Sequence, residues 1–248
     1  ANSQNQKDFF LDNIEIQNSL LKLALKKKIK RTIFLGTSCI YPKFSKTPIN
    51  EENLLSGKLE KTNQCYAIAK ISGIKLCEAL KEDYKLDVVC LMPTNVYGHN
   101  DNFNQIDGHV IPAIISKFEE AIKKKKKKTI LLGTGKPLRE FIHSEDLASA
   151  ILFSLKIKKN KIFKIFKSEL PVMNVGTNDE ISIKKLSELI AKYLNYDGKI
   201  IFDKISPDGT FRKNLDTSKI NKLGWLPKIN FKDGLKKVID NRKFKQSP

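Results

Sequence analysis

The feature that most constrains the fold is a pair of short apolar runs, over 32–37 and 87–92, that each stop at small polar residues. Runs of this length between polar flanks are typical of strands buried inside a sheet. The first ends at Gly36 to Cys39 and the second at Pro93 to Val96. Ligands of open α/β sheets bind beyond the carboxyl ends of the strands, so we expect both ends to face one crevice.

A helix is predicted between these strands, from about residue 63 to Tyr84. It carries Tyr66 and Lys70, which a spacing of four residues puts on one helix face. A cation close to a phenol stabilises phenolate, so we expect Lys70 to lower the pKa of Tyr66 from about 10 toward neutrality. On its own the pair equally fits a helix with a half-buried tyrosine and a solvated lysine.

Helices and strands alternate along the rest of the chain. Residues 1–10 are expected to end a loop, and Gly133 and Gly135 to form a turn between strands. Ser144 and Ser182 are expected to cap the helices that follow them. The expected helices cover 11–29, 109–125, 144–158, 183–194, 216–223 and 230–242, and the further strands cover 129–132, 171–175 and 199–203. This pattern predicts an α/β protein with a parallel sheet.

The 248-residue chain has a formal net charge of +19, which can indicate a nucleic-acid or membrane partner. The lysines are spread over nearly every segment, however, and the run Lys123 to Lys128 has no interleaved aromatic residue. We therefore expect no nucleic-acid and no membrane partner, but a general attraction for anionic ligands. The four cysteines show no C-x-x-C pair and no zinc-ligand spacing, which favours reduced thiols, no metal and a cytoplasmic location.

Several motifs occur together and in order: GTSCIYPKF at 36–44, YAIAKISGIKLCE at 66–78, MPTNVYG at 92–98, DNF at 101–103, GHVIPA at 108–113, PLREFIH at 137–143, PDGTFRKNLD at 207–216 and LGW at 223–225. This combination resembles the GDP-L-fucose synthase family, within the extended short-chain dehydrogenase/reductase superfamily, over essentially the whole chain. The resemblance implies an N-terminally truncated, Rossmann-type doubly wound parallel sheet that lacks its first strands and its glycine-rich phosphate loop. A smaller α+β substrate domain accompanies the sheet.

The domain boundaries follow from the same resemblance. Residues 1–96 and about 129–176 are expected to form the NADP-binding domain. Residues 97–128 and about 177–248 are expected to form the substrate-binding domain. The family also implies a homodimer that forms through helices like 11–29 and 63–84.

The activity that the resemblance implies is NADPH-dependent conversion of GDP-4-keto-6-deoxy-D-mannose to GDP-L-fucose. The protons at C3 and C5 of this sugar are acidic because they flank a ketone, and epimerisation needs a base and an acid. The family places this pair at Cys39, the base, and His109, the acid. Tyr66 then protonates the alkoxide formed by reduction at C4, with Lys70 beside it and Thr37 in the place of the family's serine.

Binding residues are assigned by the same resemblance. Those expected at the cofactor are Leu35, Gly36, Thr37, Ser38, Lys70, Pro93, Thr94, Asn95, Val96 and His109. Those expected at the nucleotide sugar are Lys117, Leu132, Arg139, Asp208 and Lys213. An arginine suits bidentate binding of a diphosphate. Lys117 stands where the family usually has arginine, and Leu132 where it often has an aromatic residue.

Three alternatives stay open from the sequence. Another NAD(P)-dependent nucleotide-sugar epimerase or dehydratase would share Tyr66 and Lys70, although the pair of Cys39 and His109 argues against it. A catalytically incompetent chain that only binds a nucleotide sugar is compatible with the lack of a glycine-rich phosphate loop in these residues. A nucleic-acid binder would account for the basic charge alone.

Overall fold

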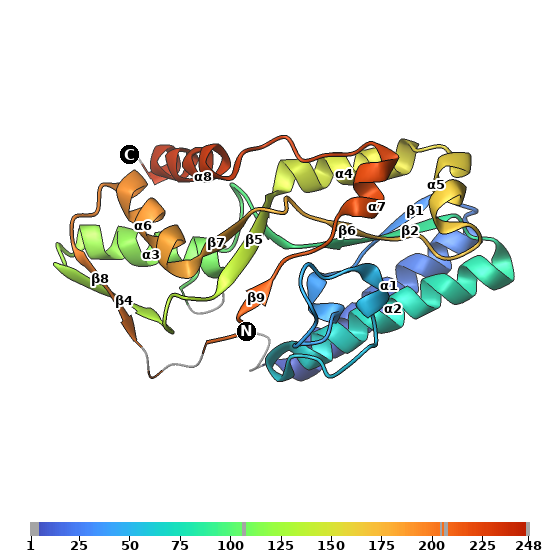
Figure 1. Ribbon diagram of the computed structural model, residues 1–248, viewed down its shortest axis with the longest axis horizontal. Helices are drawn as coiled ribbons and strands as arrows, with labels where there is room; N and C mark the ends of the chain where they lie inside the picture. Colours follow the sequence, from blue (N-terminus) through green and yellow to red (C-terminus); the bar gives the residue numbers. More distant parts are fainter. Residues whose placement is uncertain (1–4, 106–107, 204, 206–207, 247–248) are drawn as a thin grey trace.

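The computed structural model describes residues 5–105, 108–203, 205 and 208–246. The molecule is elongated, with two groups of elements along its long axis (Figure 1). The first group surrounds a parallel three-stranded sheet in the order β1 (Thr32–Leu35), β2 (Val88–Pro93) and β6 (Val172–Val175). One face is covered by α1 (Gln6–Lys26) and α2 (Gln64–Tyr84), and the other by α4 (Ser144–Lys156), α5 (Lys159–Phe166) and α7 (Ser218–Leu223).

The sequence of β2 explains why both faces of this sheet are covered. All six of its residues are buried, and successive side chains of a strand point to opposite faces. Val88, Cys90 and Met92 join the apolar cluster under α1 and α2. Val89 and Leu91 join the cluster under α4, α5 and α7. A continuous apolar run thus specifies a doubly covered strand, as the sequence predicted.

The second group is built on shorter strands. A four-stranded sheet contains β3 (Asn95–Tyr97), β5 (Leu138–His143), β7 (Glu180–Ser182) and β9 (Arg212–Lys213), and a separate parallel pair contains β4 (Lys128–Leu132) and β8 (Lys199–Asp203). The helices α3 (Val110–Lys123), α6 (Ile183–Leu194) and α8 (Phe231–Gln246) pack around them. Short 3-10 turns occur at η1 (Ser38–Ile40), η2 (Glu51–Asn53) and η3 (Lys61–Asn63).

Two expectations about elements need correction. The loop expected over residues 1–10 is wrong from Gln6 on, where α1 already begins, while residues 1–4 lie outside the described residues. Phe9 meets the Tyr66 ring edge-on at 6.2 Å, so a tertiary contact extends this helix. The cap of α4 is His143, whose side chain accepts a hydrogen bond from the Glu145 backbone, and Ser144 is the first helical residue.

The pairing of β4 bears on the expected domain boundaries. Residues 129–176 were expected to stay with the nucleotide-binding domain, but β4 pairs with β8 and Leu131 is buried in the core of the second group. The domain division itself stays a prediction. The turn expected at Gly133 and Gly135 is confirmed: both have a positive φ, of 78° and 74°, which glycine adopts without strain.

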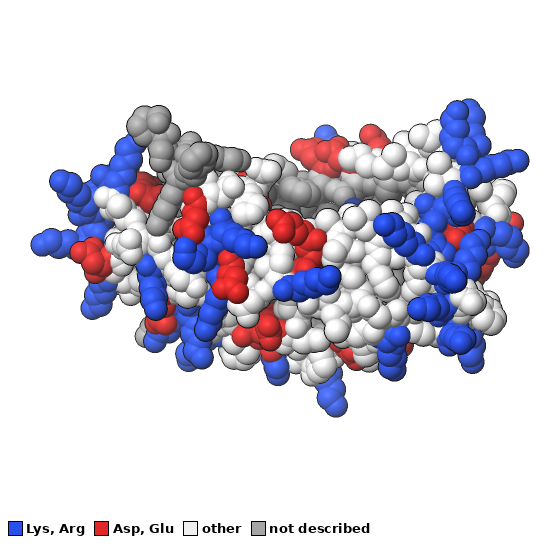
Figure 2. Space-filling view, turned by 90° about the horizontal axis from the view of Figure 1, so that it is seen from above, with Lys and Arg blue, Asp and Glu red and all other residues white. Residues whose placement is uncertain are grey.

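Charged side chains are scattered rather than gathered in one stripe on the face shown in Figure 2, where lysine and arginine crowd both ends of the long axis. Within the described part of the chain, no helix is both long enough and apolar enough to cross a membrane.

Candidate active site

The two strand ends and the Tyr66 helix open into one cavity, as the sequence predicted. Its lining includes residues 36–39 after β1, Tyr66 of α2, residues 93–96 at the end of β2, His109 before α3, and Arg139 of β5. Tyr97, Ile111, Pro112 and Phe141 complete much of the apolar wall. Chemistry-bearing side chains from both groups of elements therefore meet in one place.

Thr37 and Tyr66 form the polar core of this cavity. The Thr37 side chain accepts a hydrogen bond from the Cys39 backbone at 3.2 Å and hydrogen-bonds the Tyr66 phenol. Ser38, the neighbouring hydroxyl, is only 5% exposed. The structure thus brings the Thr37 hydroxyl to the tyrosine, which supports choosing Thr37 over Ser38 as the counterpart of the family's serine.

Burial controls the protonation of Tyr66. It raises the pKa of the phenol, and the charge of Cys39 raises it further, whereas the hydrogen bond to Thr37 opposes the shift. The expected lowering by Lys70 is therefore wrong for this structure. The Lys70 ammonium lies 5.9 Å from the centroid of the Tyr66 ring and 5.5 Å from that of Phe34, so it faces ring planes instead of the phenol oxygen.

Lys70 itself is half-buried, and desolvation lowers its pKa. Among the described residues it has no carboxylate within ion-pair distance. A half-buried ammonium without an acidic partner, next to a phenol and a hydroxyl, fits the hydroxyl-rich ribose of a nicotinamide nucleotide. The residues present therefore fit the nicotinamide end of the expected cofactor.

His109 is the N-cap residue of α3, and its side chain is 81% exposed at the cavity mouth. Its Nδ1 lies 3.4 Å from Oδ1 of Asp101. This hydrogen bond raises the pKa of His109, against a smaller opposing effect of desolvation. A raised pKa favours the protonated imidazole, which is the form that a proton donor needs. Asp101 was missed as a functional residue in the sequence, although it lies in the DNF motif.

A second cavity adjoins the first and shares Gly108, Val110 and Arg139 with it. It is lined by Lys117, Leu132 and Asp208 among the residues expected at the nucleotide sugar. Burial lowers the pKa of Arg139, whose Nη1 donates to the carbonyl of Thr210 at 2.7 Å. The carboxylate of Asp208 accepts hydrogen bonds from both the backbone and the hydroxyl of Thr134, so it fixes the turn beside the cavity.

Three expected residues lie elsewhere. Leu35 is 39% exposed on β1, and neither it nor Lys70 lines the first cavity. The ammonium of Lys213 lies 3.6 Å from the sulfur of Cys39, at the edge of the first cavity and away from the second.

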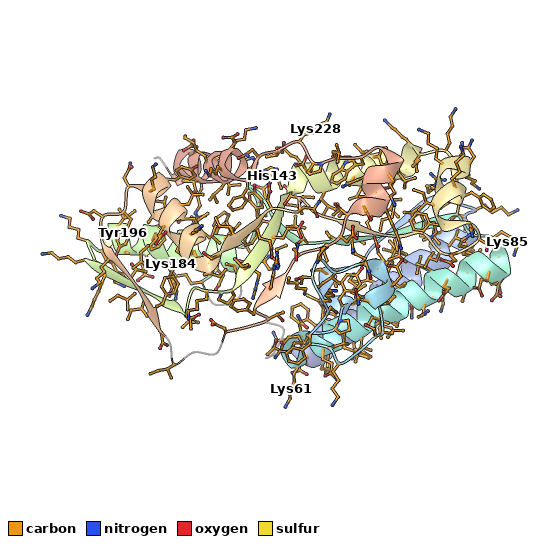
Figure 3. The ribbon with its side chains drawn as sticks, in the orientation of Figure 1. Lys61, Lys85, His143, Lys184, Tyr196 and Lys228 are labelled. Atoms are coloured by element: carbon orange, nitrogen blue, oxygen red, sulfur yellow. The ribbon has the colours of Figure 1, made fainter. Side chains whose placement is uncertain are left out.

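His99, His143 and Glu145 bring ligand atoms within 4.8 Å of one another, a spacing that a metal could use. His143 lies near the middle of the long axis, where β5 meets α4 (Figure 3). A metal on its Nε2 would need the ring proton on Nδ1, but Nδ1 accepts the Glu145 backbone N–H at 3.2 Å. The arrangement favours a structural histidine.

The comparisons with known proteins agree with this geometry. The model of the NAD dependent epimerase/dehydratase family matches residues 1–166, which defines the class of protein. Probable GDP-L-fucose synthase 1 of Oryza sativa subsp. japonica is 44% identical, over 95% of this chain and 69% of the relative. GDP-L-fucose synthase of Escherichia coli (strain K12) is 40% identical, over 95% of this chain and 73% of the relative. The chain belongs to the GDP-L-fucose synthase family.

Solved structures with a similar fold are also known, and one of them is bound to NADP. A GDP-6-OMe-4-keto-L-xylo-heptose reductase from C. jejuni superposes with a TM-score of 0.90 at 32% identity, over 99% of this chain and 79% of that one. A GDP-L-fucose synthetase from Naegleria fowleri bound to NADP superposes with a TM-score of 0.84 at 26% identity, over 98% of this chain and 75% of that one. The Rossmann-type α/β fold class is confirmed.

Proposed function

We propose that this chain converts GDP-4-keto-6-deoxy-D-mannose to GDP-L-fucose by epimerisation at C3 and C5 and then reduction of the C4 ketone with NADPH. One observation carries the proposal: Thr37, Cys39, Tyr66 and His109 line the same cavity. A simple reductase needs the tyrosine and the hydroxyl, whereas a second acid/base pair has a use only if carbon centres are also inverted.

The epimerisation stage uses the sulfur and the imidazole. Cys39 takes a proton from the carbon next to the ketone, and the electron pair of the broken C–H bond moves to the carbonyl oxygen. His109 returns a proton to the opposite face of that carbon. The exposed position of His109 allows it to recover its proton from solvent.

The reduction stage uses Tyr66 and Thr37. When bound, NADPH supplies the hydride for C4. Tyr66 donates its phenolic proton to the C4 oxygen, and the Thr37 hydroxyl orients that oxygen. Lys70 would hold the ribose of the cofactor, and residues 93–96 would line its nicotinamide side.

The assay follows loss of NADPH absorbance with GDP-4-keto-6-deoxymannose, in D₂O so that deuterium at C3 and C5 reports epimerisation separately. Because the relatives are longer than this chain, residues 1–248 are compared with a version extended upstream of Ala1. Cys39→Ser should abolish deuterium incorporation. Nucleotide-sugar binding without turnover in either version would favour the binding-only alternative.

The proposal includes a homodimer and a cytoplasmic location. All four cysteines are free, and Cys77 and Cys90 are buried as thiols, which suits a reducing compartment. Exposed apolar side chains on α1, among them Ile16 and Leu20, support the dimer.

A further inference from the structure

The direction of the Lys213 side chain is set by strand pairing. In β9, Arg212 lies opposite Leu138 of β5 and Lys213 lies opposite Arg139. Consecutive side chains of a strand point to opposite faces. Arg212 points outward, where its Nη2 lies 2.6 Å from a carboxylate oxygen of Glu180. Lys213 points the other way, and its Nζ lies 3.6 Å from Sγ of Cys39.

The segment around Lys213 is anchored on both sides. On one side the backbone N–H of Leu138 donates to the carbonyl of Phe211 at 2.8 Å. On the other side the Leu215 N–H donates to the buried carboxylate of Glu140 at 2.9 Å, and the Ile49 N–H donates to the Asn214 carbonyl at 2.9 Å. The position of the ammonium next to the sulfur is therefore built into the fold.

The charges in the cavity suggest a role for the contact between the Lys213 ammonium and the Cys39 sulfur. Two groups there act as anions or developing anions, the Tyr66 oxygen and the Cys39 sulfur, and the charge of Cys39 raises the pKa of Tyr66. Lys70 lies over the Tyr66 ring, whereas Lys213 lies against the sulfur. Among the described residues, Lys213 has no carboxylate within ion-pair distance, so its charge is available to the sulfur.

We propose that Lys213 is a positioning residue that keeps Cys39 in the thiolate form required of the epimerisation base. An ammonium that donates to sulfur favours thiolate over thiol. The thiolate then takes the proton of the C3–H or C5–H bond to become a thiol, and the electron pair of that bond moves to the C4 oxygen. Lys213 stays protonated throughout and exchanges no proton.

This role differs from the one that the family resemblance implies for Lys213, which is contact with the nucleotide sugar. The inference rests on the proposed function for the identity of the carbon acid. The state of the sulfur, however, can be measured without any substrate. Failure of the inference and failure of the proposed function are therefore separable.

The test measures the rate of Cys39 alkylation by iodoacetamide as a function of pH, with the alkylated peptide identified by mass spectrometry. Lys213→Met should slow the alkylation of Cys39 at neutral pH and move the midpoint of the pH profile upward, because the sulfur loses its neighbouring positive charge. Lys213→Arg keeps the positive charge and should restore most of the reactivity. Lys213→Gln replaces the methionine variant if circular dichroism shows that variant to be unfolded.

Arg212→Gln is the matched control, because it removes the outward ion pair of the same strand and leaves Lys213 in place. Its alkylation profile should match that of the parent chain. An unchanged midpoint in Lys213→Met, or an equal shift in Arg212→Gln, would overturn the inference. A shifted midpoint in a chain that never turns over the GDP-sugar would support the inference and count against the proposed function.

Discussion

Protonation of Tyr66 is governed by burial more than by its lysine neighbour. A phenol whose pKa is raised stays protonated at neutral pH, which is the form that a proton donor needs. Reduction should therefore hold at neutral pH and decline as the pH rises through the raised pKa. We expect a different use for Lys70, whose ammonium faces ring planes and is available to a cofactor hydroxyl.

Replacing Tyr66 by phenylalanine should reduce NADPH consumption by about 10²- to 10⁴-fold, the usual contribution of a general acid. Deuterium incorporation at C3 and C5 should persist, because Cys39 and His109 are untouched. Steady-state NADPH oxidation and NMR of the sugar measure the two stages. Tyr84→Phe is the control: Tyr84 is 62% exposed at the far end of the same helix and should leave both stages unchanged. An equal loss of NADPH oxidation and of deuterium incorporation would argue against separate roles for Tyr66 in reduction and for Cys39 and His109 in epimerisation.

Asp101→Asn should lower the pKa of His109. The hydrogen bond that the His109 ring donates to the Asp101 carboxylate is the largest cause of its raised pKa, and the charge of Asp101 adds to it. With the carboxylate removed, His109 should lose its proton at a lower pH, so the acid form should disappear earlier as the pH rises. An NMR titration of the imidazole signals, with His109→Gln to assign them, measures the midpoint.

The pH profile of epimerisation supplies the functional side of this prediction. Its alkaline limb should move to lower pH in Asp101→Asn if His109 is the acid. An imidazole midpoint that moves while the limb stays in place would remove His109 from that role.

At the scale of elements, one buried carboxylate ties three segments together. Glu140 of β5 is fully buried, and its Oε1 accepts the backbone N–H groups of Thr177 and Asn178, at 2.6 and 2.9 Å. Its Oε2 accepts the N–H of Leu215 at 2.9 Å. The segments after β6 and β9 are thereby fixed to β5, which also carries Arg139.

Glu140→Gln should destabilise the fold by at least about 2 kcal/mol, because an amide NH₂ would face a backbone N–H that loses its acceptor. Urea unfolding followed by circular dichroism measures the free energy. Glu82→Gln makes the same chemical change at an exposed position of α2 and should have little effect. A loss no larger than that of the control would mean that Glu140 does not hold these segments together.

His143 should make the protein less stable in acid. Burial is the largest cause of its lowered pKa, with Glu145 opposing the shift and His99 adding to it. Because the unfolded chain binds the proton more readily, this contribution to stability is present above the unfolded pKa of about 6.5 and is lost as the pH falls below it. The loss of unfolding free energy from pH 7.5 to 5.5 should be smaller in His143→Gln than in the parent. An identical loss of unfolding free energy in the variant and the parent would show that another group controls the acid sensitivity.

The sequence predicted elements better than their pairings. The apolar run of β2 and the spacing of Tyr66 and Lys70 are local patterns, so the strand and the helix that carries both residues were correctly expected. The pairing of β4 with β8 joins residues about seventy apart and depends on the core of the second group. The contact of Lys213 with Cys39 likewise depends on the register of β9, which no local pattern records.

At the scale of the whole molecule, the candidate active site lies where the two groups of elements meet. The first group supplies residues 36–39 and Tyr66, and the second supplies His109 and Arg139. Any movement between the groups would change the distance between the sulfur and the imidazole. A rigid junction is thus required for epimerisation, and Glu140 and the anchored β9 segment help to provide it.

The outer side of α1 should form the interface of a homodimer. Leu21 and Ala24 are buried, whereas Ile16, Leu20 and Leu23 are 60%, 61% and 48% exposed. The exposed residues are spaced by four and three, which places them on one stripe of the helix, and Ile68 of α2 adds to the exposed apolar surface. An apolar stripe on a helix that is already packed on its other side is typical of an interface.

Ile16→Glu combined with Leu20→Glu should therefore convert the protein to a monomer at micromolar concentration, because two charges would be buried in the interface. Light scattering coupled to gel filtration measures the mass. Leu152→Glu introduces the same charge at a 55% exposed leucine of α4 and should leave the dimer intact. A parent chain that is already monomeric at this concentration, or a double variant that remains dimeric, would rule out this stripe as the interface. Since none of Ile16, Leu20 and Leu23 lines the cavity, the monomeric variant should keep its NADPH oxidation rate within about twofold if it stays folded.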